Sequence, residues 1–193
     1  MRKSILVIPL CILCSCYQNK NNKTLAESNK LDVNKNTSPS EIVQISDLIP
    51  LLGKTIDSLP NFGLYKKQQI TIEGDEGEEW NGINYLDENQ IAFLIESNWE
   101  NKKTVYRITI FSNKIKDGNL QVGQRISNIK SILDPNIPSS PDGYLFVKMK
   151  AKSEISAQLD ISNISDKDPL YYGVKNISNI PDSLKIESIV IMK

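Results

Sequence analysis

Between residues 41 and 193, apolar and polar positions alternate with the two-residue period of β-strands. In residues 155–161, Ile155, Ala157, Leu159 and Ile161 alternate with polar residues, and this period predicts a strand with one buried face. Further strands are predicted at residues 70–72, 91–95, 106–110, 144–149 and 184–192. The run at 91–95 is apolar on both faces, which favours an interior position in the sheet.

Short turns separate the predicted strands. Gly, Asp, Asn and Pro gather at residues 74–77, 87–89, 98–103 and 141–143, and such clusters mark turns. Consecutive strands joined by short turns favour antiparallel pairing. We therefore predict that residues 41–193 form a single α+β domain, with a mostly antiparallel, twisted sheet and two short helices.

The two predicted helices lie in segments that resemble each other. Residues 52–59 and 122–129 share the order apolar, Gly, polar, polar, Ile, polar, polar, apolar. In each segment the glycine provides a turn, and apolar residues spaced three apart indicate one face of a helix. The second helix is expected to extend through Ile132 and Leu133. The match indicates an internal repeat, but a glycine before a helix is common enough that chance can also produce it twice.

The first 40 residues follow a different pattern. Two basic residues precede an apolar stretch, residues 5–13, which is shorter than the roughly 20 residues of a membrane-spanning helix. The stretch ends in Leu13-Cys14-Ser15-Cys16, which resembles the lipobox of bacterial lipoproteins, although Cys14 stands where a smaller residue is usual. The resemblance implies that residues 1–15 are a signal peptide and that acylated Cys16 holds the protein in a lipid bilayer. An ordinary secretory leader is the alternative.

Residues 16–40 are predicted to form a lipidated, flexible tether. Asn, Lys, Ser and Thr dominate them, and such a composition buries too little surface to offset the entropy of ordering. Tyr17 follows the lipidated position. The lipoprotein resemblance implies sorting as in enterobacteria, where Asp at this position retains a lipoprotein in the inner membrane. Tyr17 is not Asp, so the sorting rule favours the outer membrane. We therefore expect a location in the bacterial envelope, at the outer membrane where the cell has one, with the leaflet left open.

A longer phrase lies at residues 105–133. It consists of a strand, the turn Asp117-Gly118-Asn119, then Val122-Gly123 and a helix. This sequence pattern resembles one found in uncharacterised envelope lipoproteins of the Bacteroidetes type. A weaker version of the pattern lies at residues 185–191. Those families have no settled catalytic residues, so the resemblance implies none here.

The Asn-, Lys- and Ile-rich composition also resembles that of Bacteroidetes proteins. Exported proteins of that group are O-glycosylated at motifs similar to Asp57-Ser58-Leu59 and Asp182-Ser183-Leu184. The resemblance therefore implies Ser58 and Ser183 as candidate glycosylation sites. Coincidence is the alternative, because motifs of three residues recur freely.

Composition argues against several kinds of chemistry. The chain has 23 basic and 23 acidic residues without a basic patch, which argues against a nucleic-acid partner. It has no histidine, and its three cysteines all lie at or before residue 16. The usual general base, the histidine-dependent nucleophiles and most zinc or other transition-metal sites are therefore missing. We expect no enzymatic activity, no cofactor and no metal site, with a carboxylate-based hydrolase as the alternative.

A charged turn is the best sequence candidate for a binding site. Residues 73–79 hold five carboxylates next to Trp80, and an aromatic side chain beside such charges can anchor a basic protein partner. The contact residues would be Asp75, Glu76, Glu78, Glu79, Trp80 and Tyr85. Alternatively, Tyr85 lies in the core and the acidic residues only hydrate the turn. A calcium ion is a further alternative, although the spacing matches no EF-hand loop.

The expected function is therefore a non-enzymatic binding or structural role in the envelope. An immunity or inhibitor lipoprotein that neutralises a basic toxin or hydrolase is the alternative, since the acidic turn would suit such a partner.

Overall fold

The computed structural model describes residues 42–136, 143–165 and 176–193. All of them belong to one compact unit, Thr37–Lys193. The predicted signal peptide, the lipidated Cys16 and the tether lie outside the described residues. Within the described ranges, no helix has both the length and the apolar character needed to cross a membrane.

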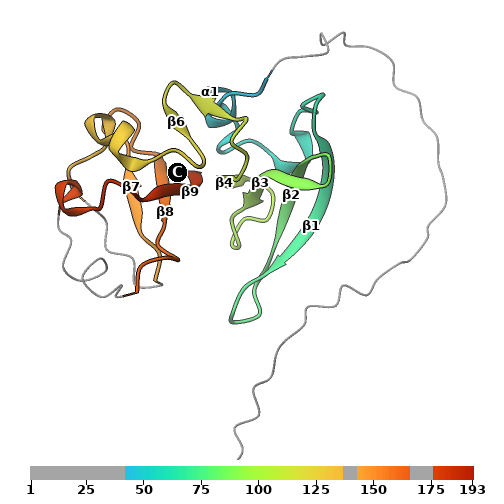
Figure 1. The fold of residues 1–193 in the computed structure, drawn as a ribbon. Helices are drawn as coiled ribbons and strands as arrows, with labels where there is room; N and C mark the ends of the chain where they lie inside the picture. The colour runs from blue at the N-terminus through green and yellow to red at the C-terminus, as the bar shows by residue number, and fades with distance from the viewer. Residues whose placement is uncertain (1–41, 137–142, 166–175) are drawn as a thin grey trace, which may run out of the picture. The chain divides into compact units, whose positions relative to one another are not determined.

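One antiparallel sheet of seven strands dominates the fold (Figure 1), which confirms the predicted mostly antiparallel sheet. Its order is β1-β2-β3-β4-β9-β8-β7, and every neighbouring pair is antiparallel. The strands are β1 (Lys66–Glu73), β2 (Glu79–Asp87), β3 (Gln90–Ser97), β4 (Val105–Ile110), β7 (Phe146–Lys148), β8 (Ile155–Asp160) and β9 (Lys185–Met192). A separate ribbon pairs β5 (Lys116–Asp117) with β6 (Leu120–Gln121).

Helical structure is shorter than predicted. The α-helix α1 (Ile45–Leu48) is one turn long and continues into the 3-10 turn η1 (Ile49–Leu51). The two predicted helices are wrong. The first segment contains only the 3-10 turn η2 (Ile56–Ser58), and the second contains η3 (Ile126–Asn128) and η4 (Lys130–Ile132). A further 3-10 turn, η6, spans Ile177–Asn179.

The glycines explain why neither segment forms a regular helix. Gly53 and Gly123 have φ angles of +80° and +82°, in the left-handed region that glycine occupies at little cost. Two residues later, Thr55 and Arg125 are extended. Each segment therefore presents backbone groups to a neighbouring strand before a single 3-10 turn begins.

The sheet has a covered face and an open face. Alternate side chains of the covered face pack under the short helical segments and are at most 2% exposed; they include Ile83, Tyr85, Phe93, Ile95, Ile108, Ile110, Ile189 and Ile191. Ile45, Leu48, Ile56 and Ile126 of the helical segments complete this core. The strand β3 is interior, as predicted, but it is not buried on both faces, because Leu94 reaches the open face.

The two similar segments make the same backbone hydrogen bonds. The Gly53 N–H donates to the Val105 carbonyl at 2.8 Å, and the Gly123 N–H donates to the Ile186 carbonyl at 2.8 Å. Three residues further on, the N–H groups of Ile56 and Ile126 donate to the carbonyls of Lys103 and Leu184, both at 2.8 Å. One segment thus fastens the start of β4 and the other fastens the start of β9, which confirms the internal repeat.

The repeat extends through the strands. Along β4 and β9, Ile108 pairs with Ile191, Thr109 with Val190 and Ile110 with Ile189. The register shift between Glu96 and Ser97 in β3 recurs in β8 between Gln158 and Leu159. By register, β4 corresponds to β9, β3 to β8 and β2 to β7, related by a pseudo-twofold axis that passes between Thr109 and Val190.

Candidate functional site

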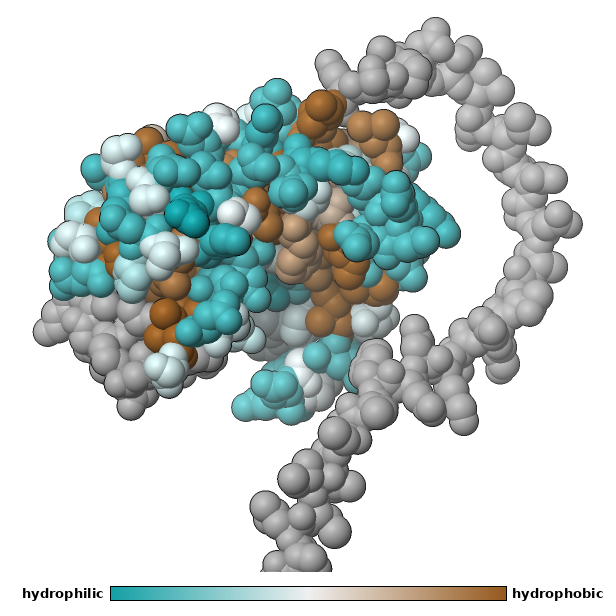
Figure 2. Space-filling model, in the orientation of Figure 1, coloured by the Kyte–Doolittle hydropathy of each residue, from teal (hydrophilic) through white to brown (hydrophobic). Residues whose placement is uncertain are grey.

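The open face of the sheet carries a hollow with a volume of about 990 Å³. Side chains from both edge strands, β1 and β7, line this same hollow, so the sheet must curve around it. Figure 2 shows hydrophobic surface gathered in a depression between two more hydrophilic flanks. The volume lies at the upper end of the roughly 300–1,000 Å³ typical of small-molecule sites. Its lining includes Leu94, Glu96, Arg107, Thr109, Phe111, Phe146, Lys148, Glu154, Ser156, Gln158, Val190, Met192 and Lys193.

Large apolar side chains remain exposed in the hollow. Tyr144 is 51% exposed, and Phe111 and Met192 are each 42% exposed. The ring centroids of Tyr144 and Phe146 lie 6.2 Å apart. Exposed apolar side chains gathered in one hollow mark an interaction site more often than isolated exposed residues do.

An ion pair with a buried carboxylate and a partly exposed guanidinium lies at one end of the hollow. Arg107 donates from Nε to Glu96 Oε2 at 2.6 Å and from Nη2 to Glu96 Oε1 at 2.7 Å. Trp80 Nε1 donates to the same Oε1 at 3.2 Å. The Glu96 side chain is 4% exposed, whereas that of Arg107 is 42% exposed. The hydrogen bonds to Glu96 raise the pKa of Arg107 above its usual value, so the guanidinium stays charged.

The second half of the sheet carries a neutral pair at the equivalent positions. Gln158 corresponds to Glu96, and Ser188 corresponds to Arg107. Ser188 Oγ donates to Gln158 Oε1 at 3.1 Å, and Gln158 Nε2 donates to Glu187 Oε2 at 2.8 Å. The same strand register therefore supports a charged pair in one half and a neutral pair in the other.

Gly82 lets two side chains cover the first half of the open face. A Cβ atom at Gly82 would lie 2.8 Å from Ile72 Cδ1 and 2.9 Å from Ile70 Cγ1. Gly82 pairs with Glu96 across β2 and β3. Its missing side chain lets Ile70 and Ile72 extend the apolar wall toward the ion pair.

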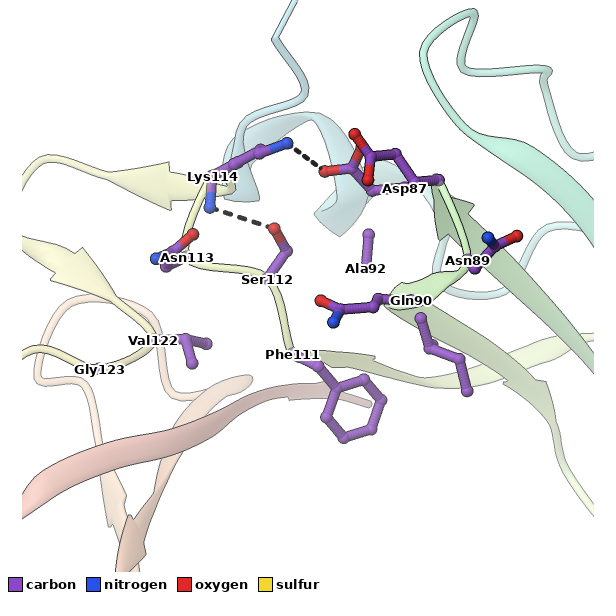
Figure 3. Close-up of a pocket in the computed structure, with 12 residues that line it drawn as sticks. Asp87, Asn89, Gln90, Ala92, Phe111, Ser112, Asn113, Lys114, Val122 and Gly123 are labelled. Carbon is purple, nitrogen blue, oxygen red and sulfur yellow. Dashed lines mark hydrogen bonds and ion pairs between the residues drawn. The ribbon is translucent and has the colours of Figure 1, made fainter.

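A second, more polar pocket of about 550 Å³ lies where β2 turns into β3. Figure 3 shows Lys114 reaching Asp87, with an Nζ–Oδ2 distance of 2.6 Å, while its backbone N–H donates to Ser112 Oγ at 3.1 Å. The ion pair raises the pKa of Lys114, but the side chain is 64% exposed, so solvent screens the interaction. Nothing in this pocket combines a fixed charge with apolar walls as the hollow does.

The structure separates the residues of the predicted acidic site, because the acidic residues lie at or near the surface and Tyr85 lies in the core. Asp75, Glu76 and Glu79 are exposed in or beside the turn between β1 and β2, and the Glu76 N–H donates to Glu78 Oε2 at 3.2 Å. Tyr85 is 0% exposed, and its hydroxyl donates to the Pro60 carbonyl at 2.9 Å. The assignment of Tyr85 to a partner surface is therefore wrong, because its ring stacks on Phe93 in the core.

The remaining predicted residues stay candidates. Trp80 is half-buried and its indole N–H is engaged with Glu96. Ser58 and Ser183 are both exposed, and the Ser58 hydroxyl donates to the Thr55 carbonyl at 2.8 Å; glycosylation at either serine stays a prediction. Among the residues that the structure describes, no group of three or more acidic, histidine or cysteine side chains is arranged to hold a metal ion.

The hollow was not among the features predicted from the sequence. Its signal is present in the strand pattern, since Leu94 and Glu96 alternate with buried residues of β3, and Arg107 and Thr109 do the same in β4. Only the register, which places Glu96 opposite Arg107, brings these side chains together.

No family model matches the chain, and no curated protein sequence matches it. Among solved structures, it is similar to the crystal structure of the uncharacterized protein yfeY from Escherichia coli. The TM-score is 0.51 at 16% sequence identity, and the match covers 68% of this chain and 84% of yfeY. At this identity the similarity shows a shared fold and nothing about activity.

Proposed function

We propose that this chain is a lipid-anchored protein of the bacterial envelope, and that its domain binds a ligand in the hollow of the open face without catalysing a reaction. The lipobox-like Leu13-Cys14-Ser15-Cys16 supports the anchor and the location. The observation that carries the binding role is the hollow itself. It places exposed apolar side chains next to an Arg107 that is held in one orientation by Glu96.

The residue types that line the hollow also support binding over catalysis. The chain contains no histidine, and the carboxylate at the base of the hollow, Glu96, accepts hydrogen bonds from both Arg107 and Trp80. Both carboxylate oxygens of Glu96 are therefore already occupied by donors of the protein itself. The same contacts suit a fixed recognition group.

The anchor is tested with Cys16→Ser. The variant is expected to move from the detergent phase to the aqueous phase in detergent partitioning, or to remain uncleaved. Mass spectrometry of the mature wild-type N-terminus is expected to find acylated Cys16. An unmodified terminus within residues 17–40 would contradict the anchor.

The binding role is tested with a neutral, polarity-sensitive dye, Nile red. The protein is the mature chain from residue 16 with Cys16→Ser, which keeps every described residue and removes the predicted lipid. The dye is expected to fluoresce with this parent and to lose its signal with Thr109→Trp, which fills the middle of the hollow. Thr71→Trp, at an exposed position outside the hollow, is the control. Equal dye binding by all three proteins would contradict the proposal.

One observation favours an immunity or inhibitor role as a second candidate. Within the described residues, none of the five carboxylates at positions 73–79 takes part in an ion pair, so their charge is available to steer a basic protein. Lysozyme serves as a basic probe. Glu76→Lys should weaken salt-sensitive binding, whereas Glu100→Lys, a matched charge reversal in another turn, should not. Equal binding by both variants would exclude the hairpin.

A further inference from the structure

We propose that the hollow binds a long-chain aliphatic carboxylate, with the carboxylate on Arg107 and the chain extending along the open face toward the aromatic side chains at the other end. This inference rests on the proposed binding function of the hollow and names its ligand class.

Arg107 has guanidinium hydrogens that are not donated to any group in the described structure. Its Nε hydrogen and one of its two Nη2 hydrogens are donated to Glu96. Within the described structure the guanidinium makes no other hydrogen bond. The two Nη1 hydrogens and the second Nη2 hydrogen therefore remain available on a side chain that is 42% exposed and lines the hollow. A guanidinium can donate two parallel hydrogen bonds to a carboxylate. Because Glu96 already fixes its orientation, little further side-chain entropy is lost on binding.

Arg107 lies at one end of the hollow, and the aromatic side chains of Phe111, Tyr144 and Phe146 lie at the other end, beside Gln158 and Glu187. Arg107 pairs with Met192 at one end, and Phe111 lies four residues further along the same chain direction, which corresponds to roughly 13 Å in an extended strand. At that second end, Phe146 pairs with Gln158 across β7 and β8, and Tyr144 packs near Phe146. Thr109 and Val190 lie between the two ends. A chain attached to a head group on Arg107 can extend past Thr109 and Val190 to the aromatic side chains at the other end.

The lining charges favour a single negative charge over a double one. Arg107, Lys148 and Lys193 face Glu96, Glu154 and Glu187 around the hollow, so the formal charges balance. A carboxylate gains the charge-assisted hydrogen bonds of Arg107. A phosphate monoester carries up to two charges and meets more repulsion from Glu154 and Glu187.

The second half of the sheet suggests which substitutions would remove the head-group site. At the equivalent positions of the other half, Gln158 and Ser188 form a neutral pair within the same register. The double variant Glu96→Gln with Arg107→Ser copies that pair into the first half. It removes the guanidinium without leaving an unpaired buried charge, so the fold is expected to persist.

The test uses calorimetric titration of the mature Cys16→Ser chain with dodecanoate and dodecyl phosphate, each below its micelle concentration, and with dodecanol below its solubility limit. Dodecanoate is expected to bind about tenfold or more tightly than dodecanol, as one or two charge-assisted hydrogen bonds would give. The double variant is expected to bind dodecanoate about as weakly as dodecanol, with its affinity for dodecanol unchanged. Lys114→Ser, which removes the basic partner of an ion pair outside the hollow, is the control and should keep the preference for dodecanoate.

Each other outcome overturns the inference. Equal dodecanoate affinity in parent and double variant would exclude Arg107 as the head-group site, and tighter binding of dodecyl phosphate would identify a phosphate ligand instead. If Nile red occupies the hollow but no dodecyl compound binds, the carboxylate assignment fails while the proposed binding function stands. If neither the dye nor any dodecyl compound binds, both fail.

Discussion

The two halves of the sheet correspond residue by residue, yet their two faces have diverged to different degrees. On the covered face the equivalent pairs are all apolar: Ile83 with Val147, Phe93 with Ile155, Ile95 with Ala157, Ile108 with Ile189, and Ile110 with Ile191. On the open face the pairs differ in charge or polarity: Leu94 with Ser156, Glu96 with Gln158, and Arg107 with Ser188. The shared register shows that this difference does not arise from the backbone.

The difference separates what holds the fold together from what the fold presents. Covered-face positions tolerate only side chains that fill space under the short helical segments, since a buried polar group without a partner is costly. Open-face positions accept polar side chains where these are paired, since Glu96 and Ser188 are buried but hydrogen-bonded. A charged pair in one half and a neutral pair in the other are both compatible with the sheet, which makes the open face the place where function can be added.

The largest expected effect comes from breaking the covered face. Ile108→Ala and Ile189→Ala each remove a side chain that is 0% exposed at equivalent positions of the two halves. Each should lower the free energy of unfolding by about 3–4 kcal/mol, as truncation of a buried isoleucine does. Urea denaturation of the mature Cys16→Ser chain measures both. Val190→Ala, on the open face between them, should cost much less, and an equal cost would contradict the division into two faces.

A smaller effect is expected from breaking the charged pair on one side only. Arg107→Ser leaves the carboxylate of Glu96, which is 4% exposed, without its counter-ion, and this should cost about 2–3 kcal/mol. Adding Glu96→Gln should restore stability to within about 1 kcal/mol of the parent, because the neutral pair is then reproduced. The same urea experiment compares the three proteins. Failure of Glu96→Gln to rescue Arg107→Ser would show that the two halves are not interchangeable at this position.

The turns of the repeat should respond alike. Gly53→Ala and Gly123→Ala each place a Cβ in the left-handed region, at φ +80° and +82°, while no neighbouring atom lies closer than 3.8 Å to either Cβ. Backbone strain alone should therefore cost about 1–2 kcal/mol in each variant. Gly63→Ala is the control, because its Cβ meets nothing within 4 Å and its φ is not in that region. Unequal costs for Gly53 and Gly123 would weaken the structural equivalence.

The smallest effect concerns Tyr85, a titrating side chain of the covered face. Burial raises the pKa of Tyr85 from 10 to about 12, and register places Met149 at the equivalent position in the second half. Because the folded pKa lies above the unfolded one, the stabilisation is complete below about pH 10 and is lost as pH rises toward 12. Tyr85→Phe should cost about 1 kcal/mol at neutral pH through the lost hydrogen bond to Pro60.

The alkaline titration of Tyr85 is measured by thermal melts between pH 9 and about pH 12. The parent should lose stability over this interval more steeply than Tyr85→Phe, which has no phenol at that position. Parallel curves for the two proteins would show that Tyr85 does not carry the alkaline loss.

Local pattern was sufficient to predict the repeat and most strands of the main sheet, but it predicted no strand at β2 and only residues 70–72 of β1. The period of two in residues 155–161 predicts β8, and β4 and β9 follow from the same signal. The shared phrase around Gly53 and Gly123 predicts two similar segments, since both glycines must supply the same backbone conformation.

The errors arose where tertiary contacts decide the structure. Apolar spacing in the two repeat segments suggested helices, but their N–H groups bond to strands instead, and tertiary hydrogen bonding overrides a weak local propensity. The charged neighbours of Tyr85 suggest a partner contact, but its position in the alternating pattern of β2 places it in the core.

The hollow was out of reach of the sequence for a related reason. Glu96 and Arg107 lie on different strands, and the turn between them leaves the register undetermined until the bulge after Glu96 is known. A slip of one residue would send either side chain to the covered face. The curvature that brings β1 and β7 to one hollow is likewise a property of the whole sheet.

The central claim, that the open face is an accessible binding surface while the covered face is sealed, is tested most directly by thiol labelling. From residue 16 onward the Cys16→Ser chain contains no cysteine, so a single introduced thiol reports one position. In Thr109→Cys, in the middle of the hollow, a maleimide is expected to react in the native protein nearly as fast as in urea, and dodecanoate should slow the reaction. In Val147→Cys, on the covered face and 0% exposed, native labelling should be far slower than in urea. Labelling of Thr109→Cys as slow as that of Val147→Cys would contradict the account.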